Sequence, residues 1–250
     1  MITRRESIVA MGVAALFPRT VFGQQATKII RVGYLGPTTA AASYTSRWQG
    51  FQDEMRALGY QSGRNIAYQV LWANNDATRL PELAAELVRS NVDLILTNGT
   101  PAVLATKRAT STIPIVMAAS GDAVGTGIVP SLARPGGNIT GITFFDPELS
   151  GKRLALLKDL NPKIRRIAIM FVPGNPVNTP ILRVLETTAS HLKLKFEKVE
   201  IKRPEEIPDA IASIAKSHVD AFSLTQDTMI AENLPLIATH ALKHRLPAIG

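Results

Sequence analysis

Residues 114–129, PIVMAASGDAVGTGIV, join a short apolar run to a segment with three glycines and one carboxylate. The run at 114–119 predicts a buried strand. A glycine-rich exit from such a strand can cradle a phosphate, line a cleft for a small molecule, or serve helix packing on the sheet alone. We expect Asp122 to approach a small ligand here, and Gly125 and Gly127 to begin a helix close to the sheet.

On both sides of this stretch, short apolar runs alternate with longer segments at helical spacing. Strands connected through helices of this length form βαβ crossovers, which build a parallel sheet covered on both faces. The expected strands are 29–34, 66–71, 92–97, 115–117, 139–143, 167–172, 195–199, 221–224 and one starting at 247. The expected helices include 46–58, 80–88, 147–160, 177–192, 207–215 and 229–245.

The alternation pauses near residues 140–147 and then restarts, so the sequence predicts an α/β protein with two Rossmann-like lobes joined by a hinge. We place the lobes at 28–143 and 144–250. The last strand has barely begun at Gly250. We therefore expect the second lobe to be incomplete and a C-terminal part to be missing.

The first 23 residues have the order of a secretory signal: two arginines, an apolar run of about ten residues and a small-residue end. That run is too short to cross a bilayer, which needs roughly twenty residues. An anchor or a plain first helix is the alternative. Arg4 and Arg5 resemble a twin-arginine signal, but Ser7 and Val9 depart from it, so the choice between the twin-arginine and general secretory routes stays open.

Composition and motifs exclude several kinds of chemistry. The chain has no cysteine, which rules out disulfides, thiolate nucleophiles and a bacterial lipoprotein anchor. The net charge is +8, but its basic residues are scattered, and we expect no nucleic-acid partner. The phosphate-loop, dinucleotide and G-x-S-x-G patterns are absent. His240 and His244 lack the rest of a metal motif, so we predict no catalytic residue, cofactor or metal.

Ligands of open parallel sheets bind beyond the carboxyl ends of the strands, so the residues just after each strand are the candidate site. These residues are rich in short hydrogen-bonding side chains and carboxylates. Each of them can also be explained as a helix N-cap that needs no ligand. The candidate ligand-binding residues are Thr38, Thr39, Asn98, Gly99, Thr100, Ser120, Gly121, Asp122, Asn175, Gln226 and Asp227.

Two consecutive stretches, SGDAVGTGIVPSLARPGGNITGIT (120–143) and PELSGKRLALLKDL (147–160), carry a family resemblance. They resemble the ABC-transporter substrate-binding proteins of the tryptophan/tyrosine-binding type, which have the type I periplasmic-binding fold. Weaker agreement covers most of the remaining chain. The resemblance implies a monomeric periplasmic receptor, not an enzyme, that closes on a small polar solute, either amino-acid-like or a related metabolite. Such a receptor delivers its solute to an ABC permease in the inner membrane.

Within this resemblance, Asp122 would take an ammonium group or a pair of hydroxyl groups, and the backbone N–H groups at 98–100 would take a carboxylate. Asn175, Gln226 and Asp227 would face them from the second lobe. The family carries Asp-Pro where this chain has Asp122 and Ala123, which alters the stiffness of the loop.

Aromatic walls are not evident from the sequence, and we do not assign tryptophan as the solute. The candidates for aromatic contacts are Tyr44, Trp72, Phe144 and Phe145. Two other functions stay open: a periplasmic sensor domain for a membrane receptor, and a hydrolase or isomerase that uses the same cleft.

Overall fold

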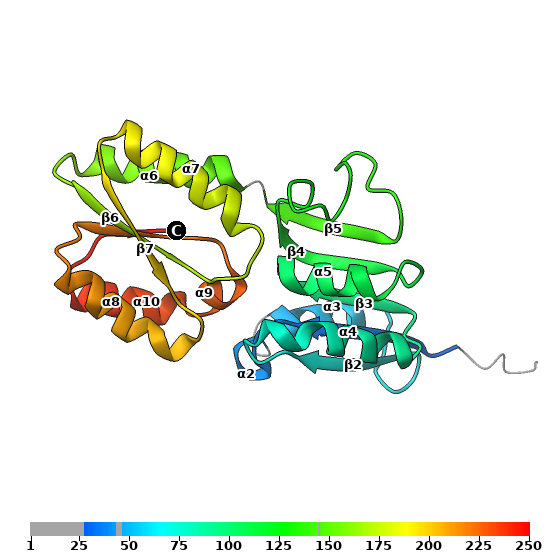
Figure 1. Cartoon of the computed structure of the whole chain (residues 1–250). Coiled ribbons are helices and arrows are strands. Elements are labelled where there is room, and N and C mark those ends of the chain that lie inside the picture. The colour runs from blue at the N-terminus through cyan, green and yellow to red at the C-terminus, as the bar shows by residue number, and fades with distance from the viewer. Residues whose placement is uncertain (1–27, 44–46, 145) are drawn as a thin grey trace, which may run out of the picture.

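The computed structural model describes residues 28–43, 47–144 and 146–250. The predicted export segment lies outside the described residues, as do Tyr44 and Phe145. The described chain forms two parallel sheets that lie side by side in Figure 1. We call residues 28–144 the first lobe and residues 146–250 the second lobe.

The first lobe holds a five-stranded parallel sheet in the order β2-β1-β3-β4-β5. Its strands are β1 (Ile30–Gly36), β2 (Ile66–Trp72), β3 (Leu94–Asn98), β4 (Ile115–Gly121) and β5 (Ile139–Phe144). Its helices are α2 (Ala40–Ser43), α3 (Gln49–Ala57), the short 3₁₀ turn η2 (Ala77–Arg79), α4 (Leu80–Arg89) and α5 (Thr100–Ala109).

The second lobe holds a four-stranded parallel sheet in the order β7-β6-β8-β9. Its strands are β6 (Arg166–Phe171), β7 (Lys195–Glu200), β8 (Ala221–Leu224) and β9 (Ala248–Ile249). Its helices are α6 (Asp146–Leu160), α7 (Asn178–His191), the 3₁₀ turn η3 (Pro204–Glu206), α8 (Ile207–Lys216), α9 (Thr228–Glu232) and α10 (Leu234–Lys243). In Figure 1, α6 and α7 lie above the second sheet, and α8, α9 and α10 lie below it. The predicted α/β class with two parallel-sheet lobes is confirmed.

Alternating side chains give each sheet two apolar faces, because successive residues of a strand point to opposite sides. In the first lobe, Leu35 and Ile95 pack with α4 and α5, whereas their neighbours Tyr34 and Leu96 pack on the opposite face with Trp48. In the second lobe, alternate residues of β6 pack with α8 and α10 or with α6 and α7. None of the helices in the described ranges is long and apolar enough to cross a bilayer.

One glycine fixes the edge of the first sheet. The register between β4 and β5 shifts between Met117 and Ser120. Gly141 lies opposite Met117 with φ at 140°, and a Cβ atom there would overlap the Met117 carbonyl group. Only glycine combines this backbone angle with such a close approach. The conformation explains why a glycine stands in the middle of a strand.

The expected helix after β4 does not form. Residues 122–138 run through turns and extended segments. Asp122 has φ at 20°, and its carboxylate accepts a 2.9 Å hydrogen bond from the Gly125 N–H, which closes a tight turn. Ile128 and Val129 then pack into the first-lobe core. The apolar residues of this segment therefore bury themselves without helical periodicity.

The helix expected over 229–245 is divided into α9 and α10. Asn233 lies at the junction, and its side-chain Nδ2 donates to the Met229 carbonyl at 2.8 Å. Pro235 stands in the first turn of α10. Backbone N–H groups there have no partner within the helix, so the missing N–H of proline costs no helical hydrogen bond. The break keeps α9 as a separate short helix beside the carboxyl end of β8.

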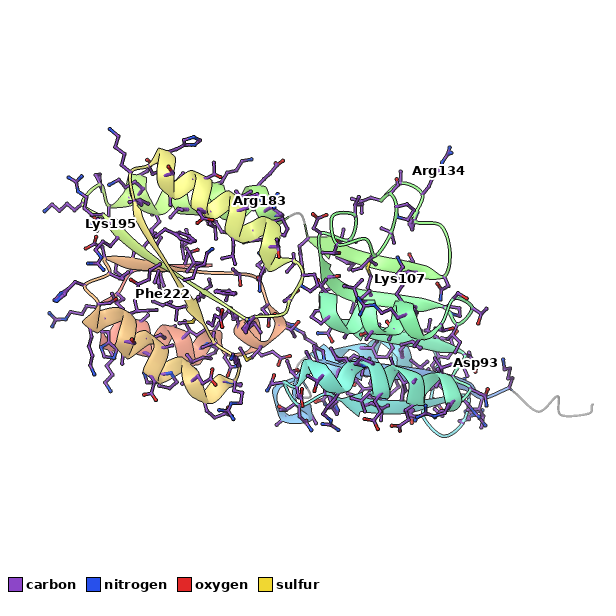
Figure 2. All side chains as sticks on the ribbon, in the orientation of Figure 1. Asp93, Lys107, Arg134, Arg183, Lys195 and Phe222 are labelled. Carbon is purple, nitrogen blue, oxygen red and sulfur yellow. The ribbon has the colours of Figure 1, made fainter. Side chains whose placement is uncertain are left out.

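Among the described residues, Phe222 has the largest fully buried side chain, and it lies between the helix layers of the second lobe (Figure 2). We predict that Phe222→Ala lowers the free energy of unfolding by about 3–5 kcal/mol, because it removes apolar contacts and leaves a cavity. Urea denaturation measures this loss. The control is Leu242→Ala on α10, where the side chain is 79% exposed and the change should stay within about 0.5 kcal/mol. Equal effects of the two substitutions would contradict this placement of the core.

Candidate functional site

A cavity of about 600 Å³ lies between the lobes, at the carboxyl ends of the strands. The first lobe contributes residues of β1, β3, β4 and β5, the start of α3 with the two residues before it, and the start of α5. The second lobe contributes Asn175, the end of β8 with the residues that follow it, and residues of α9 and α10. Parallel strands bring all their carboxyl ends to one edge of a sheet, which explains how residues far apart in sequence meet here.

The start of α5 forms the polar floor in the first lobe. Gly99 adopts φ 80°, a left-handed angle that favours glycine, and turns the chain from β3 into the helix. The Thr100 Oγ1 accepts a 3.1 Å hydrogen bond from the Gly121 N–H and lies 3.2 Å from the Ser120 Oγ. These bonds join the ends of β3 and β4. They present the N-terminus of a ten-residue helix to the cavity, where partial positive charge favours an anion.

Aromatic side chains line the first-lobe side of the cavity. Tyr34 and Trp48 have ring centroids 4.7 Å apart, and Phe51 lies 5.3 Å from Trp48. All three line the cavity, as does Phe144 of β5. Of this wall, the sequence predicted Phe144 alone. Trp72, the other predicted candidate in the described residues, packs edge-on against Tyr34 and does not line the cavity.

The phenol of Tyr34 is a neutral donor. Its hydroxyl donates a 2.8 Å hydrogen bond to the Asn98 Oδ1 inside the first lobe. Burial raises the pKa of Tyr34 well above its usual range, and the negative charge of Glu232 adds to the rise, while Arg47 opposes it. Arg47 also lines the cavity, so a cation from the first lobe stands at its wall.

Asp227 supplies a carboxylate from the second lobe. Its Oδ2 accepts a 2.7 Å bond from the Asn175 Nδ2, and its Oδ1 accepts a 2.8 Å bond from the Met229 N–H as the N-cap of α9. Burial raises the pKa of Asp227, against the lowering effect of these bonds. Each carboxylate oxygen can accept about two hydrogen bonds, so Asp227 keeps acceptor capacity beyond the bonds from Asn175, Met229 and Ile230.

Two buried side-chain atoms in the described part of the chain have no hydrogen-bond partner there: the Asn178 Oδ1 and the Thr225 Oγ1. Thr225 is 1% exposed and lines the cavity. Asn178, at the start of α7, is 4% exposed and lines neither of the two cavities described. Thr225 directly follows β8, where candidate residues are expected, but it is not among the predicted ligand-binding residues, because a threonine after a strand also fits an ordinary N-cap or turn.

The structure gathers most of the predicted ligand-binding residues around the cavity. Those that line it are Asn98, Gly99, Thr100, Ser120, Gly121, Asn175, Gln226 and Asp227. Thr38, Thr39 and Asp122 do not line it. Asp122 instead caps the tight turn after β4, so the role expected for it, holding an ammonium group, does not fit its position. The carboxylate at the cavity wall is Asp227.

Thr38 lies at a second contact between the lobes. Its hydroxyl donates a 3.1 Å hydrogen bond to the Glu232 Oε1 of α9. It also lines a small space of about 60 Å³ beside the main cavity, together with Asn175 and Asp227. Thr38 therefore belongs to the lobe–lobe contact, whereas Thr39 lines neither space. No group of three or more His, Asp or Glu that could hold a metal ion occurs within residues 28–43, 47–144 and 146–250.

The chain belongs to the family described as ABC transporter substrate binding protein, whose pattern matches residues 40–250. A tyrosine-binding protein of Clostridioides difficile is 32% identical over 205 residues. The match takes in 81% of this chain and 58% of that relative, so the chain spans less than two thirds of the relative's length.

Two solved structures share the fold. The ABC domain from Streptococcus pneumoniae in complex with L-Trp is 23% identical, with a TM-score of 0.71. A conserved domain protein from Vibrio cholerae is 25% identical, with a TM-score of 0.75. Each match covers 88% of this chain and 73% of the other. The similarity confirms the type I periplasmic-binding fold that the sequence motifs indicated.

Proposed function

We propose that this protein is the solute receptor of an ABC importer and that its cavity takes an aromatic L-amino acid. The observation that carries the proposal is the composition of the interlobe cavity. An aromatic wall and a helix N-terminus from the first lobe face a carboxylate from the second. These are the three groups that recognise a side-chain ring, an α-carboxylate and an α-ammonium group.

The polar groups suit the two charges of a free amino acid. The N-terminus of α5 and the side chain of Arg47 would hold the carboxylate. Asp227 would hold the ammonium group across the cavity, with Asn175 fixing the orientation of the carboxylate. Because the two charges of the solute bind to different lobes, the solute would stabilise the closed arrangement over the open one.

The aromatic wall selects the side chain. Tyr34, Trp48 and Phe51 form tilted ring pairs beside the cavity, and a solute ring could pack against their apolar edges and faces. Two relatives support the same chemistry. The Clostridioides difficile relative is a tyrosine-binding protein, and the Streptococcus pneumoniae structure holds L-Trp.

Delivery to a permease in the inner membrane, and a periplasmic location, belong to the same proposal. The export signal expected at residues 1–23 supports the location. The alternative functions, a sensor domain for a membrane receptor and a hydrolase or isomerase, share the cavity but differ in the fate of the bound solute. An enzyme would convert the solute, whereas a receptor returns it unchanged.

The proposal is tested by thermal unfolding of the purified protein with single L-amino acids. L-Tyrosine and L-tryptophan should raise Tm progressively with concentration, because a solute that binds only the folded state stabilises it. L-Lysine and L-aspartate should leave Tm unchanged, since neither offers a ring. Mass analysis after incubation should return the amino acid unaltered. Absence of any shift with the aromatic amino acids would overturn the proposal, and conversion of the bound amino acid would favour an enzyme.

Closure depends on two glycines at the carboxyl ends of β3 and β4. A Cβ atom at Gly99 would lie 2.8 Å from the Thr228 Oγ1, and one at Gly121 would lie 2.6 Å from the Val177 Cγ2. Thr228 and Val177 belong to the second lobe, at the starts of α9 and α7. The lobes therefore touch where the first lobe carries no side chain.

We predict that Gly121→Ala weakens L-tyrosine binding, because the added methyl group would meet the buried Val177 before the lobes reach this closed arrangement. Overpacking of this kind costs about 1–3 kcal/mol, a roughly five- to hundredfold loss of affinity when the strain falls on the closed state. Calorimetric titration measures the affinity. Gly50→Ala on α3 is the control, since a Cβ atom there meets nothing within 4 Å. Equal affinities of both variants would refute this role for Gly121.

Asp227→Asn should lower the affinity for L-tyrosine about ten- to hundredfold, because a hydrogen bond to a charged group contributes about 1.5–3 kcal/mol. Asparagine caps a helix as well as aspartate, so α9 should persist. The exposed Asp209→Asn on α8 is the control and should bind as the wild type does. An unchanged affinity of Asp227→Asn would exclude Asp227 from the site.

The pH dependence follows from the raised pKa of Asp227. Because burial penalises the ionised carboxylate, stability that is lost above the raised pKa returns as pH falls through it. The Tm of ligand-free Asp227→Asn should therefore equal or exceed that of the wild type at neutral pH. Binding has the opposite dependence, because the wild type should lose affinity as acid neutralises Asp227. Calorimetric titration at decreasing pH should show this loss of affinity in the wild type. Asp227→Asn should not show it, because asparagine has no charge to lose.

A further inference from the structure

The end of the second lobe that lies opposite the cavity is strongly basic. The carboxyl ends of its parallel strands face the cavity, so the amino ends of the strands and the C-terminal ends of the helices gather at the other end. We call the connections from α6, α7, α8 and α10 to the strands that follow them the basic pole, residues 158–166, 191–197, 216–220 and 243–247. In Figure 2, Lys195 lies at the end of the second lobe that points away from the first lobe.

The basic pole carries the whole excess of positive charge in residues 28–250. It holds nine Lys and Arg against three carboxylates, whereas the rest of these residues hold sixteen of each. The nine cations are scattered along the sequence, and the fold brings them together from four separate connections. A local excess of this size creates a positive potential at this end of the molecule.

Helix ends account for only part of this charge. A cation in the last turn of a helix interacts favourably with the helix dipole, and Lys158, Lys216 and Lys243 have that position. Lys158 also donates to the Pro162 and Ile164 carbonyl groups at 2.7 Å and 2.6 Å. The other six cations lie beyond the helix ends, at Lys163, Arg165, Arg166, Lys193, Lys195 and Arg245. The helix dipole therefore does not explain them.

Within the part of the chain that the structure describes, carboxylates neutralise little of this charge. Arg166 is the one cation of the basic pole in an ion pair there, with Glu197 at 3.9 Å. The Asp220 carboxylate instead accepts hydrogen bonds from the Arg165 and Arg166 backbone N–H groups, at 2.7 Å and 2.8 Å. Seven of the nine cations are exposed, and Lys158 and Arg166 are partly exposed. The positive charges are therefore open to an anionic partner.

Two exposed leucines accompany the cations. Leu160 is 75% exposed at the end of α6, and Leu242 is 79% exposed in the last turn of α10. They are the two most exposed large apolar side chains of the described residues. Cations beside exposed apolar side chains suit a membrane surface, because the cations meet anionic headgroups while the apolar groups enter the boundary of the acyl chains. A nucleic acid would also attract the cations, but its phosphate backbone offers the leucines no apolar surroundings.

We propose that the basic pole binds the surface of an anionic phospholipid bilayer, with Leu160 and Leu242 entering the headgroup region. The pole and the cavity lie at opposite ends of the second sheet, so bilayer binding leaves the cavity free for a solute. The inference goes beyond the proposed function, because it adds a second binding surface with a different partner. It would hold the receptor on the membrane that carries the proposed permease.

The test measures how much protein sediments with phospholipid vesicles. The protein used is residues 24–250, because the apolar run of the expected export segment would itself bind lipid, and the described fold begins at residue 28. Vesicles of equal parts phosphatidylglycerol and phosphatidylcholine are anionic, and vesicles of phosphatidylcholine alone are the neutral control. The wild type should bind the anionic vesicles, and added sodium chloride should release it, since salt screens exposed charges.

The charge variant of the basic pole combines Lys163→Gln, Arg165→Gln, Lys193→Gln and Lys195→Gln. Its affinity for anionic vesicles should fall by about two to three orders of magnitude, because each cation near an anionic surface contributes about fivefold. The matched control removes four exposed cations from the first lobe, by Arg64→Gln, Arg89→Gln, Arg108→Gln and Arg134→Gln. This control has the same net charge, and it should lose less than about fivefold, since screening weakens the effect of distant charges.

The apolar variant combines Leu160→Ala and Leu242→Ala. Its affinity for anionic vesicles should fall about tenfold, because apolar groups that enter the bilayer are lost. Any binding to duplex DNA should be the same for this variant and the wild type, since the leucines contribute nothing there. The Tm of every variant should stay near that of the wild type, because the replaced side chains are exposed.

Three results would overturn the inference. The wild type could bind anionic vesicles no better than neutral ones. The charge variant and its first-lobe control could lose affinity equally, which would make net charge alone the cause. The wild type could also prefer duplex DNA to anionic vesicles while the apolar variant still binds vesicles normally, which would assign the basic pole to a nucleic acid. Vesicle binding is measured without a solute, so this inference and the proposed function fail separately.

Discussion

The interlobe site depends on a close contact between the two lobes at positions without side chains. Gly99 and Gly121 end neighbouring strands of the first sheet, and a Cβ atom at either would collide with the start of a second-lobe helix. Close-packed protein interiors tolerate little overlap of this kind, so the backbone of the first lobe sets how near the second can come. The size of the cavity and the reach of its polar groups are set by that limit.

The cavity is asymmetric in a way that suits a zwitterion with a ring. Its first-lobe side combines the rings of Tyr34 and Trp48 with a helix N-terminus, and its second-lobe side carries Asp227. Burial raises the pKa of Asp227, which means that ionising this carboxyl group carries a cost. A cation from the solute would offset this cost. The binding energy would thereby depend on closure, since the two charges of the solute bind to different lobes.

Sequence patterns predicted the sheets well because strand and helix periodicities are local signals. The same patterns located eight of the residues that line the cavity, since parallel strands gather their carboxyl ends at one edge. The role expected for Asp122 does not fit its position. Glycine-rich segments permit several turns, and the Asp122 carboxylate closes one of them by accepting a bond from the Gly125 N–H. The wall built from Tyr34 and Trp48 could not be foreseen, because these residues lie in a strand and near a helix that meet only in the folded chain. Thr225 directly follows β8, a position where ligand-binding residues are expected, but a threonine there also fits a helix N-cap, so the sequence did not single it out.

The most direct test of ligand-driven closure is a distance between the lobes in solution. The chain has no cysteine, so cysteines replacing the exposed residues Glu82 on α4 and Asp209 on α8 would be the sole sites for spin labels. Pulsed electron resonance then gives the distribution of label separations. Saturating L-tyrosine should convert a broad distribution into a narrow one at shorter distance, because the solute stabilises one closed arrangement. An identical distribution with and without bound L-tyrosine would contradict ligand-driven closure.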